Sequence, residues 1–299
     1  MKKAIVTGAN GFIGRWLIKE LLRREIEVIA VLRNKESKIN FVSDKVKIVY
    51  SELDSILDLY NNIEDRDIDV FYHLAWEGTA GKSRADYSMQ LSNAKYACDS
   101  AVVAKKIGCK KFIGIGTITE NIAQNILNIP AKAENTIYGI AKHTTHCMLD
   151  IVCKNIEMPY VWAQLSNIYG TDNTTGNIIS YTLSELKTGK RPTYSKAEQP
   201  YDLMSVEDTA VALYLLGEKN TTKNQYFIGS GKPQILSEYL LAIGSIFGDT
   251  SKIGIGERPD DGLTYDLAWF DTTDLETDTG FKTKRSFEEN MEEIIKSMT

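Results

Sequence analysis

The segment VTGANGFIGRWL, residues 6–17, places three glycines at intervals of three residues. A short β-prone run, residues 3–7, leads into it, and a run with helical spacing of apolar residues, 11–25, overlaps and follows it. Glycine permits a tight turn from strand to helix and removes side chains that would obstruct a pyrophosphate. The amino end of the helix then offers unpaired N–H groups to phosphate oxygens. Gly8, Gly11 and Gly14 therefore predict a dinucleotide site.

Strand-like and helical segments alternate around this turn and onward to about residue 170. The later expected helices cover residues 92–108 and 139–156, the first of which ends at Gly108, a suitable left-handed cap. This alternation predicts a Rossmann-type α/β fold, a doubly wound parallel sheet whose ligand crevice lies at the carboxyl ends of the strands. The expected strands are residues 3–7, 27–33, 45–53, 69–76, 110–117 and 159–170.

The alternation stops after about Gly170, where polar loops separate short helices. We therefore expect residues 1–170 to form the dinucleotide-binding domain with the catalytic residues. Residues 171–299 are expected to form a smaller substrate-binding lobe that is interleaved with the first domain and lies over the crevice. The charged end of the chain, residues 287–299, predicts an amphipathic surface helix.

Composition excludes several classes of function. The chain has 299 residues and a net charge of −5, which argues against nucleic-acid binding. No apolar run approaches 20 residues, so no membrane span is expected, and the first residues lack the apolar core of a signal peptide. The four cysteines are scattered without a Cys-x-x-Cys pair, which favours a reducing cytoplasm.

The end of the second expected strand indicates which dinucleotide fits. An acidic residue at this place binds the ribose 2′-hydroxyl of NAD and repels a 2′-phosphate. Leu32 and Arg33 stand there instead, and a guanidinium suits a phosphate. Arg15, just after Gly14, is placed to assist. The pattern predicts NADP in preference to NAD.

A second segment, TIYGIAK, residues 136–142, places Tyr138 four residues before Lys142. The two side chains would share one face of a helix, one turn apart. Both normally titrate near pH 10. This spacing is common by chance, so its meaning depends on the rest of the chain.

Five segments, in order, resemble the extended short-chain dehydrogenase/reductases, in their sugar-nucleotide epimerase/dehydratase branch. The resemblance covers essentially the whole chain and is specific for the superfamily rather than for the substrate. It implies a nucleotide-diphosphate sugar as substrate and a homodimer formed through the two helices that flank the active site. The segments are the glycine turn, HLAW at 73–76, GT at 116–117, YGIAK at 138–142 and YDLMSVEDTA at 201–210.

The resemblance implies roles for three catalytic residues. Lys142 would bind the nicotinamide ribose and lower the pKa of Tyr138, which would serve as general acid or base. The hydroxyl of Thr117 would hydrogen-bond the substrate oxygen, with Thr119 as a substitute. His73 is either a core imidazole or a direct contact of the dinucleotide, and Asn93 would support the site.

The resemblance also assigns binding residues. The dinucleotide would contact the glycine turn, the ends of the second, third and fourth strands, and the lysine of the catalytic pair. The substrate would contact residues from both parts of the chain. The predicted cofactor contacts are Gly8, Asn10, Gly11, Phe12, Ile13, Gly14, Arg33, Glu52, Leu53, Leu74, Ala75 and Lys142, and the predicted substrate contacts are Trp76, Thr119, Asn167 and Arg258.

Departures from the family pattern bear on the reaction. The 4,6-dehydratases have Asp-Glu directly after the catalytic threonine, where this chain has Ile118 and Thr119, and Glu120 comes one place late. Gln164 and Tyr201 replace frequent arginines, so the usual diphosphate contacts are not expected at these two positions. The leading hypothesis is an NADP-dependent reductase of a 4-keto-(deoxy)sugar nucleotide. A 4-epimerase that retains its cofactor and a non-catalytic dinucleotide sensor are the alternatives.

The segment HTTHC, residues 143–147, raises a further alternative. His143 shares a helix face with His146 and Cys147, a possible corner of a zinc site. No fourth ligand follows nearby, and the helix must pack beside the cofactor. We therefore expect the chain to bind no metal.

Overall fold

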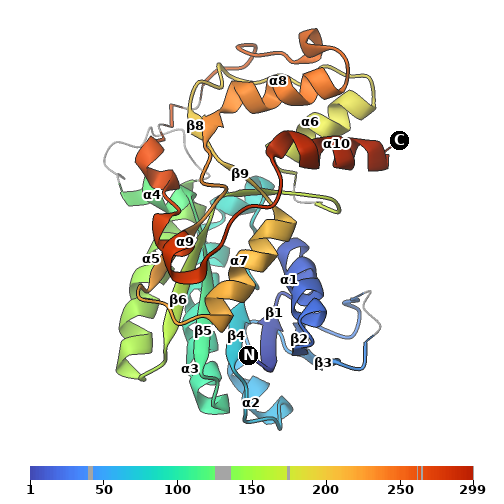
Figure 1. Ribbon diagram of the computed structural model, residues 1–299. Helices are drawn as coiled ribbons and strands as arrows, with labels where there is room; N and C mark the ends of the chain where they lie inside the picture. The colour runs from blue at the N-terminus through green and yellow to red at the C-terminus, as the bar shows by residue number, and fades with distance from the viewer. Residues whose placement is uncertain (40–42, 125–135, 174–175, 261, 264, 299) are drawn as a thin grey trace.

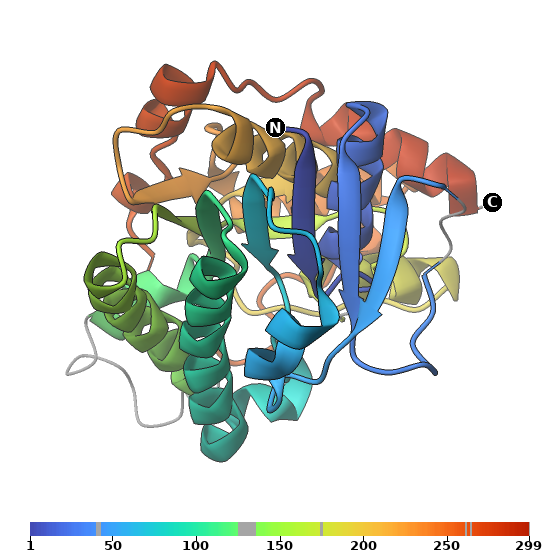
Figure 2. The ribbon, with the colours of Figure 1, turned by 90° about the horizontal axis from the view of Figure 1, so that it is seen from below.

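A computed structural model describes residues 1–39, 43–124, 136–173, 176–260, 262–263 and 265–298. Its centre is a sheet of seven parallel strands, arranged in the order β3-β2-β1-β4-β5-β6-β10 (Figures 1 and 2). The predicted doubly wound parallel sheet is therefore confirmed. The strands of the sheet are β1 (Lys3–Thr7), β2 (Glu27–Leu32), β3 (Val46–Tyr50), β4 (Val70–His73), β5 (Lys111–Thr117), β6 (Tyr160–Leu165) and β10 (Gln225–Ile228).

Helices cover both faces of this sheet because successive side chains of its strands point alternately to two apolar layers. Ala4 and Val6 of β1 pack in the layer under α1 and α7, whereas Ile5 packs in the layer under α3 and α5. Figure 1 shows these two helix pairs on opposite sides of the sheet. The helices are α1 (Phe12–Arg23), α2 (Leu59–Asn62), α3 (Tyr87–Ile107), α4 (Thr119–Gln124), α5 (Thr136–Asn155), α6 (Ile178–Lys187), α7 (Val206–Glu218), α8 (Leu236–Ile246), α9 (Thr273–Thr279) and α10 (Phe287–Met298).

Strand order reverses between β1 and β4, so the chain leaves these two neighbouring strands in opposite directions. Crevices form at such a switch point, beyond the carboxyl ends of the strands. The predicted Gly108 cap also holds: Gly108 has φ 95° and its N–H donates to the carbonyl of Ala104. The helix before it begins at Tyr87, five residues earlier than expected, because the Asp86 side chain caps it by accepting from the Met89 N–H.

The single strand expected over 159–170 is two strands, of which only the first belongs to the central sheet. After β6, Ser166 turns the chain, its hydroxyl donating to the Asp202 carbonyl. The following β7 (Asn167–Tyr169) leaves the sheet and pairs with β9 (Leu203–Ser205). The place beside β6 is taken instead by β10, which the sequence analysis did not predict. Its short apolar core, Tyr226 to Ile228, follows a polar loop and carries no distinct strand pattern.

A second layer of structure lies above the carboxyl ends of the sheet, where α6, α8 and α10 gather around their own apolar core (Figure 1). Its centre includes Leu183, Leu240 and Met291, one from each helix. The short antiparallel pair β8 (Pro200–Tyr201) and β11 (Gln234–Ile235) joins this layer. The expected carboxyl-terminal helix is present as α10, with Phe287, Met291 and Ile294 buried on one face.

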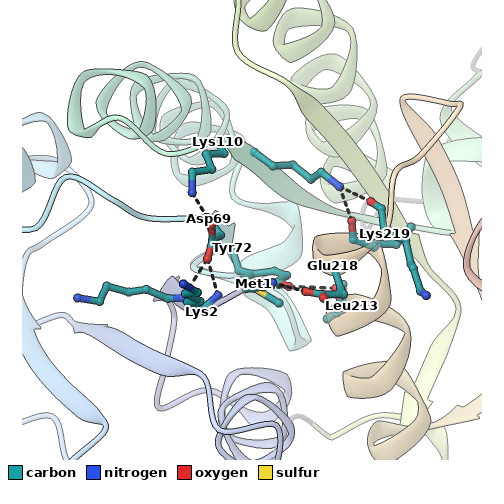
Figure 3. Close-up of polar contacts among 11 residues, drawn as sticks. Met1, Lys2, Asp69, Tyr72, Lys110, Leu213, Glu218 and Lys219 are labelled. Carbon is teal, nitrogen blue, oxygen red and sulfur yellow. Dashed lines mark hydrogen bonds and ion pairs between the residues drawn. The ribbon is translucent and has the colours of Figure 1, made fainter.

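The opposite end of the sheet, where the strands begin, is fastened by charges (Figure 3). The carboxylate of Asp69 accepts from the backbone N–H groups of Lys2 and Lys3 and, at 2.8 Å, from Nζ of Lys110. These contacts hold its pKa at about 2 although burial opposes them. Nearby the terminal amine of Met1 pairs with Glu218 of α7 at 2.5 Å.

We predict that Asp69→Asn lowers the free energy of unfolding by about 1–2 kcal/mol at pH 7. Because the folded pKa lies below the unfolded value of about 3.9, the carboxylate stabilises the protein above pH 4. This contribution is lost as pH falls from about 4 to 2, so wild type and variant should converge there. Urea denaturation at about pH 7 and pH 3 measures the difference. The control is Asp67→Asn, whose side chain is 88% exposed; an Asp69 effect that is the same at both pH values contradicts the prediction.

Candidate active site

A cavity of about 460 Å³ opens beyond the carboxyl ends of β1, β4 and β5. It is lined by the glycine turn, by the start of α5 and by residues of β7 and β8. A second cavity of about 200 Å³ shares Gly8, Gly11 and Trp76 with it and extends toward the ends of β2 and β3. Together they form an elongated site at the switch point of the sheet.

The predicted glycine turn lies between these cavities, and backbone contacts explain its glycines. Gly8 has φ 64°, and a Cβ there would stand 2.8 Å from the Ala75 nitrogen. A Cβ on Gly14 would stand 2.2 Å from the Gly8 carbonyl oxygen. Gly11 precedes α1, and no side chain caps its first N–H groups. The turn thus offers open backbone donors at a helix amino end, an arrangement that fits a dinucleotide pyrophosphate.

Thr117, Tyr138 and Lys142 meet at the wall of the larger cavity. Thr117 ends β5, and the other two lie one turn apart on α5. The hydroxyl of Thr119 donates to that of Thr117 at 3.2 Å. Nζ of Lys142 donates to the Ile115 carbonyl at 2.7 Å and lies 3.6 Å from the centre of the Trp76 ring. The structure therefore brings the three predicted catalytic residues together.

The electrostatics of Tyr138 differ from the sequence-based expectation. Burial raises the pKa of its phenol to about 12, while Arg84 and the Thr117 hydroxyl oppose the rise. The Arg84 guanidinium lies 4.5 Å from the centre of the Tyr138 ring, whereas Nζ of Lys142 lies 6.0 Å away. Burial also lowers the pKa of Lys142. Of these two cations, Arg84 is therefore the nearer to the centre of the tyrosine ring.

A buried carboxyl group lies next to the predicted catalytic residues. Glu120, at 1% exposure, accepts from the Thr117 N–H at 2.6 Å and from the Trp162 indole N–H at 3.0 Å. Burial raises its pKa, and these hydrogen bonds and the charge of Lys142 oppose the rise. His146 lies 3.8 Å from the carboxylate and stacks on Trp162. Glu120 thus orients the end of β5 without lining the cavity.

At the other end of the site, Arg33 pairs with Glu77 through Nη2 and Oε1 at 2.5 Å. Both residues line the smaller cavity. The backbone of Glu77 is fixed by the buried Asn93 amide, which accepts from its N–H at 3.0 Å and donates to its carbonyl at 2.9 Å. An acidic group therefore lies beside Arg33, and it comes from the loop after β4.

The remaining predicted residues fall into two groups. Most of them line one or both cavities, and Asn167 there accepts from the Tyr201 hydroxyl at 2.8 Å. Two predicted residues do not line either cavity: Glu52 is exposed, between Ser51 and Leu53, and Arg258 is held by Thr193 and Tyr181. The residues that line a cavity are Asn10, Phe12, Ile13, Leu53, Leu74, Ala75, Trp76, Thr119 and Asn167.

His73 is a core imidazole in the structure. Its Nδ1 lies 3.1 Å from the Thr7 hydroxyl, and burial lowers its pKa to about 3. The nearby histidine-rich segment of α5 gathers no metal-ligand set: among the described residues, no three His, Cys, Asp or Glu side chains lie close enough to hold an ion.

Sequence reasoning missed Arg84 and Glu77, which both lie in the stretch between β4 and α3. Only the position of these two residues after β4 could have indicated that they belong to the site. Charged residues that follow a strand at its carboxyl end lie at the crevice edge, but this loop matches no motif. Among the helices of the described chain, none is long and apolar enough to cross a membrane.

Comparisons with known proteins place this geometry in a family. The model of the NAD dependent epimerase/dehydratase family matches residues 4–229. The chain is 29% identical to a dTDP-6-deoxy-L-talose 4-dehydrogenase (NAD(+)) of Aggregatibacter actinomycetemcomitans, over 78% of this chain and 86% of the relative. It is 23% identical to a dTDP-glucose 4,6-dehydratase of Haemophilus influenzae, over 99% of this chain and 97% of the relative.

Solved structures agree in fold. A UDP-glucose 4-epimerase of Thermotoga maritima with UDP-glucose superposes with a TM-score of 0.81 at 20% identity, covering 99% of this chain and 98% of that one. A dTDP-glucose 4,6-dehydratase of Streptomyces venezuelae with NAD has a TM-score of 0.81 at 18% identity, covering 98% and 96%. With its glycine turn and Thr117, Tyr138 and Lys142 at one cavity, the chain belongs to the NAD-dependent epimerase/dehydratase family of sugar-nucleotide-modifying enzymes.

Proposed function

We propose that this enzyme reduces a 4-keto-6-deoxy sugar nucleotide. The observation that carries the proposal is the meeting of Thr117, Tyr138 and Lys142 at the wall of one cavity beside the glycine turn. A nicotinamide dinucleotide, when bound at the glycine turn, would supply the hydride for the carbonyl carbon. Tyr138 donates a proton to the carbonyl oxygen, Thr117 hydrogen-bonds that oxygen, and Lys142 holds the nicotinamide ribose.

Two observations support reduction at C4 in preference to loss of water. The relative from Aggregatibacter is named as a 4-dehydrogenase of a dTDP-6-deoxy sugar, and oxidation and reduction at one carbon are the two directions of one reaction. The acid that follows Thr117 is also misplaced for elimination. Glu120 is buried against Trp162, and the cavity-lining residue here is Thr119, which is neutral.

We propose NADP(H) as the preferred cofactor, with NAD as the alternative that the names of the relatives favour. The support for NADP(H) is Arg33 at the end of β2, with no acid on that strand end. Glu77 opposes it, because its carboxylate already pairs with Arg33. A 2′-phosphate must therefore take the place of Glu77 on the guanidinium.

A homodimer in the cytoplasm completes the proposal. Tyr87 and Leu91 of α3 and Ile151 of α5 are 60–70% exposed, although all three are apolar or aromatic. Together with Met148 they give the outer face of this helix pair an apolar character that suits a second copy of the chain.

We predict that Tyr138→Phe abolishes turnover while dinucleotide binding survives, because only the proton donor is removed. Lys142→Met should weaken both turnover and binding, since it removes the ribose contact and a buried charge. Single-turnover kinetics and dinucleotide titration by fluorescence separate the two effects. Turnover of Tyr138→Phe within about tenfold of wild type would assign the proton transfer to another residue.

The cofactor proposal predicts tighter binding of NADPH than of NADH. Glu77→Gln should tighten NADPH binding further by freeing Arg33, on the order of tenfold, and Arg33→Asp should reverse the preference. Calorimetry with both dinucleotides on the wild type and the two variants measures the six affinities. Asp54→Asn, which removes an exposed acid outside both cavities, is the control. Equal affinities in the wild type contradict the proposal.

The reaction itself is tested with a 4-keto-6-deoxy sugar nucleotide generated by a dehydratase. We expect NADPH absorbance to fall in equal amount with the appearance of a 4-hydroxy product. A changed sugar without net consumption of reduced dinucleotide would establish the epimerase alternative. No change in sugar or dinucleotide with any of the CDP-, UDP-, GDP- and dTDP-linked substrates would favour the sensor.

A further inference from the structure

Arg84 occupies a defined position over the catalytic tyrosine. It belongs to the short helical turn Gly81–Ala85, which follows β4, and its guanidinium lies 4.5 Å from the centre of the Tyr138 ring. The turn is fixed by the fully buried Gln90, whose amide donates to the carbonyls of Gly78 at 2.9 Å and Ser83 at 3.2 Å. Arg84 is therefore held in place from its backbone side by α3.

The guanidinium faces the cavity with unused hydrogen-bonding capacity. Arg84 lines the same cavity as Tyr138 and Thr117. Within the described part of the chain, its Nε is buried and has no hydrogen-bond partner. Arg33 and Arg191, in contrast, are paired with Glu77 and Glu257. A desolvated cation over the face of an aromatic ring interacts more strongly than an exposed one.

Besides burial, three groups act on the phenol of Tyr138, each from a different element. Arg84 of the short turn and the Thr117 hydroxyl of β5 favour the phenolate, and Glu120 of α4 disfavours it. Lys142, on the same helix as Tyr138, is farther from the ring at 6.0 Å, and burial lowers its own pKa. A guanidinium stays charged at every pH at which the enzyme works. Arg84 is thus the steady positive charge next to the tyrosine.

We propose that Arg84 is a positioning residue that acts through Tyr138: its guanidinium, held over the ring, makes the phenol a stronger proton donor. The proposal rests on the proposed role of Tyr138 in proton transfer. It accounts for a cation placed on the ring face, where the charge that develops on the phenolate is delocalised. It also assigns a separate contact to each cation. Lys142 donates to the Ile115 carbonyl, and Arg84 lies over the ring of the phenol.

The direct test titrates Tyr138 itself and needs no substrate. Phenolate absorbance is followed against pH in the NADP-bound enzyme, with the corresponding Tyr138→Phe protein subtracted. We expect Arg84→Met to raise the pKa of Tyr138 by about one unit or more, and Arg84→Lys to raise it less because it retains a charge. Lys82→Met, in the same turn with an exposed side chain, is the control and should leave the titration unchanged.

Kinetics supply the second measurement. Loss of activity at alkaline pH should follow ionisation of Tyr138, so Arg84→Met should move this limb to higher pH while the plateau of kcat falls about threefold to tenfold. Thermal unfolding identifies a variant that fails to fold, in which case Arg84→Gln replaces Arg84→Met.

The outcomes separate this proposal from the proposed function. An unchanged titration of Tyr138 in Arg84→Met overturns it, and a raised KM alone would then assign Arg84 to substrate binding. A shifted titration in an enzyme that reduces no 4-keto sugar nucleotide would retain the role of Arg84 and reject the proposed reaction.

Discussion

The buried ammonium of Lys142 is the constraint around which the site is built. At 4% exposure it has left water, and an uncompensated buried charge costs several kcal/mol. Compensation comes from separate elements: the Ile115 carbonyl of β5, the ring of Trp76 after β4, and the carboxyl of Glu120 on α4. These groups converge only if β4, β5 and α5 keep their relative positions. Compensation of the buried charge therefore fixes the predicted catalytic residues relative to the sheet.

The same burial determines how Tyr138 can work. Removing the phenol from water raises its pKa to about 12, which is unfavourable for proton transfer near neutral pH. Glu120 compensates Lys142 but also disfavours the phenolate. The carboxylate that stabilises the buried ammonium of Lys142 therefore makes the Tyr138 phenol a weaker acid. A second cation near the ring opposes this effect, and the guanidinium of Arg84, from the loop after β4, lies 4.5 Å from the ring centre.

The parts of this structure that the sequence predicted are those set by local chemistry. Gly8 has a positive φ, Gly14 is required by a backbone approach within the same turn, and the Tyr138–Lys142 spacing is a property of one helix. The sheet positions of β7 and β10, in contrast, depend on pairing with segments distant in the sequence. Asn167–Tyr169 joins β9 because the chain turns at Ser166, and residues 225–228 become a strand because β6 offers a free edge. The Arg33–Glu77 pair joins two loops separated by 44 positions. The residues at the end of β2 therefore predicted the arginine but not its acidic partner.

The loop between β4 and α3 contributes to both ends of the site, because Glu77 lines the smaller cavity and Arg84 lines the larger one. Two side chains of α3, Gln90 and Asn93, hold this loop from beneath. Asn93 binds both backbone groups of Glu77, and Gln90 binds the carbonyls of Gly78 and Ser83 as well as the indole of Trp76. They stand three residues apart, on one face of the helix. Since most of these anchors are made to backbone atoms, they do not depend on which side chains the loop carries. The exposed positions of the loop can therefore change, and with them the groups presented to cofactor and sugar, while the backbone that presents them stays fixed.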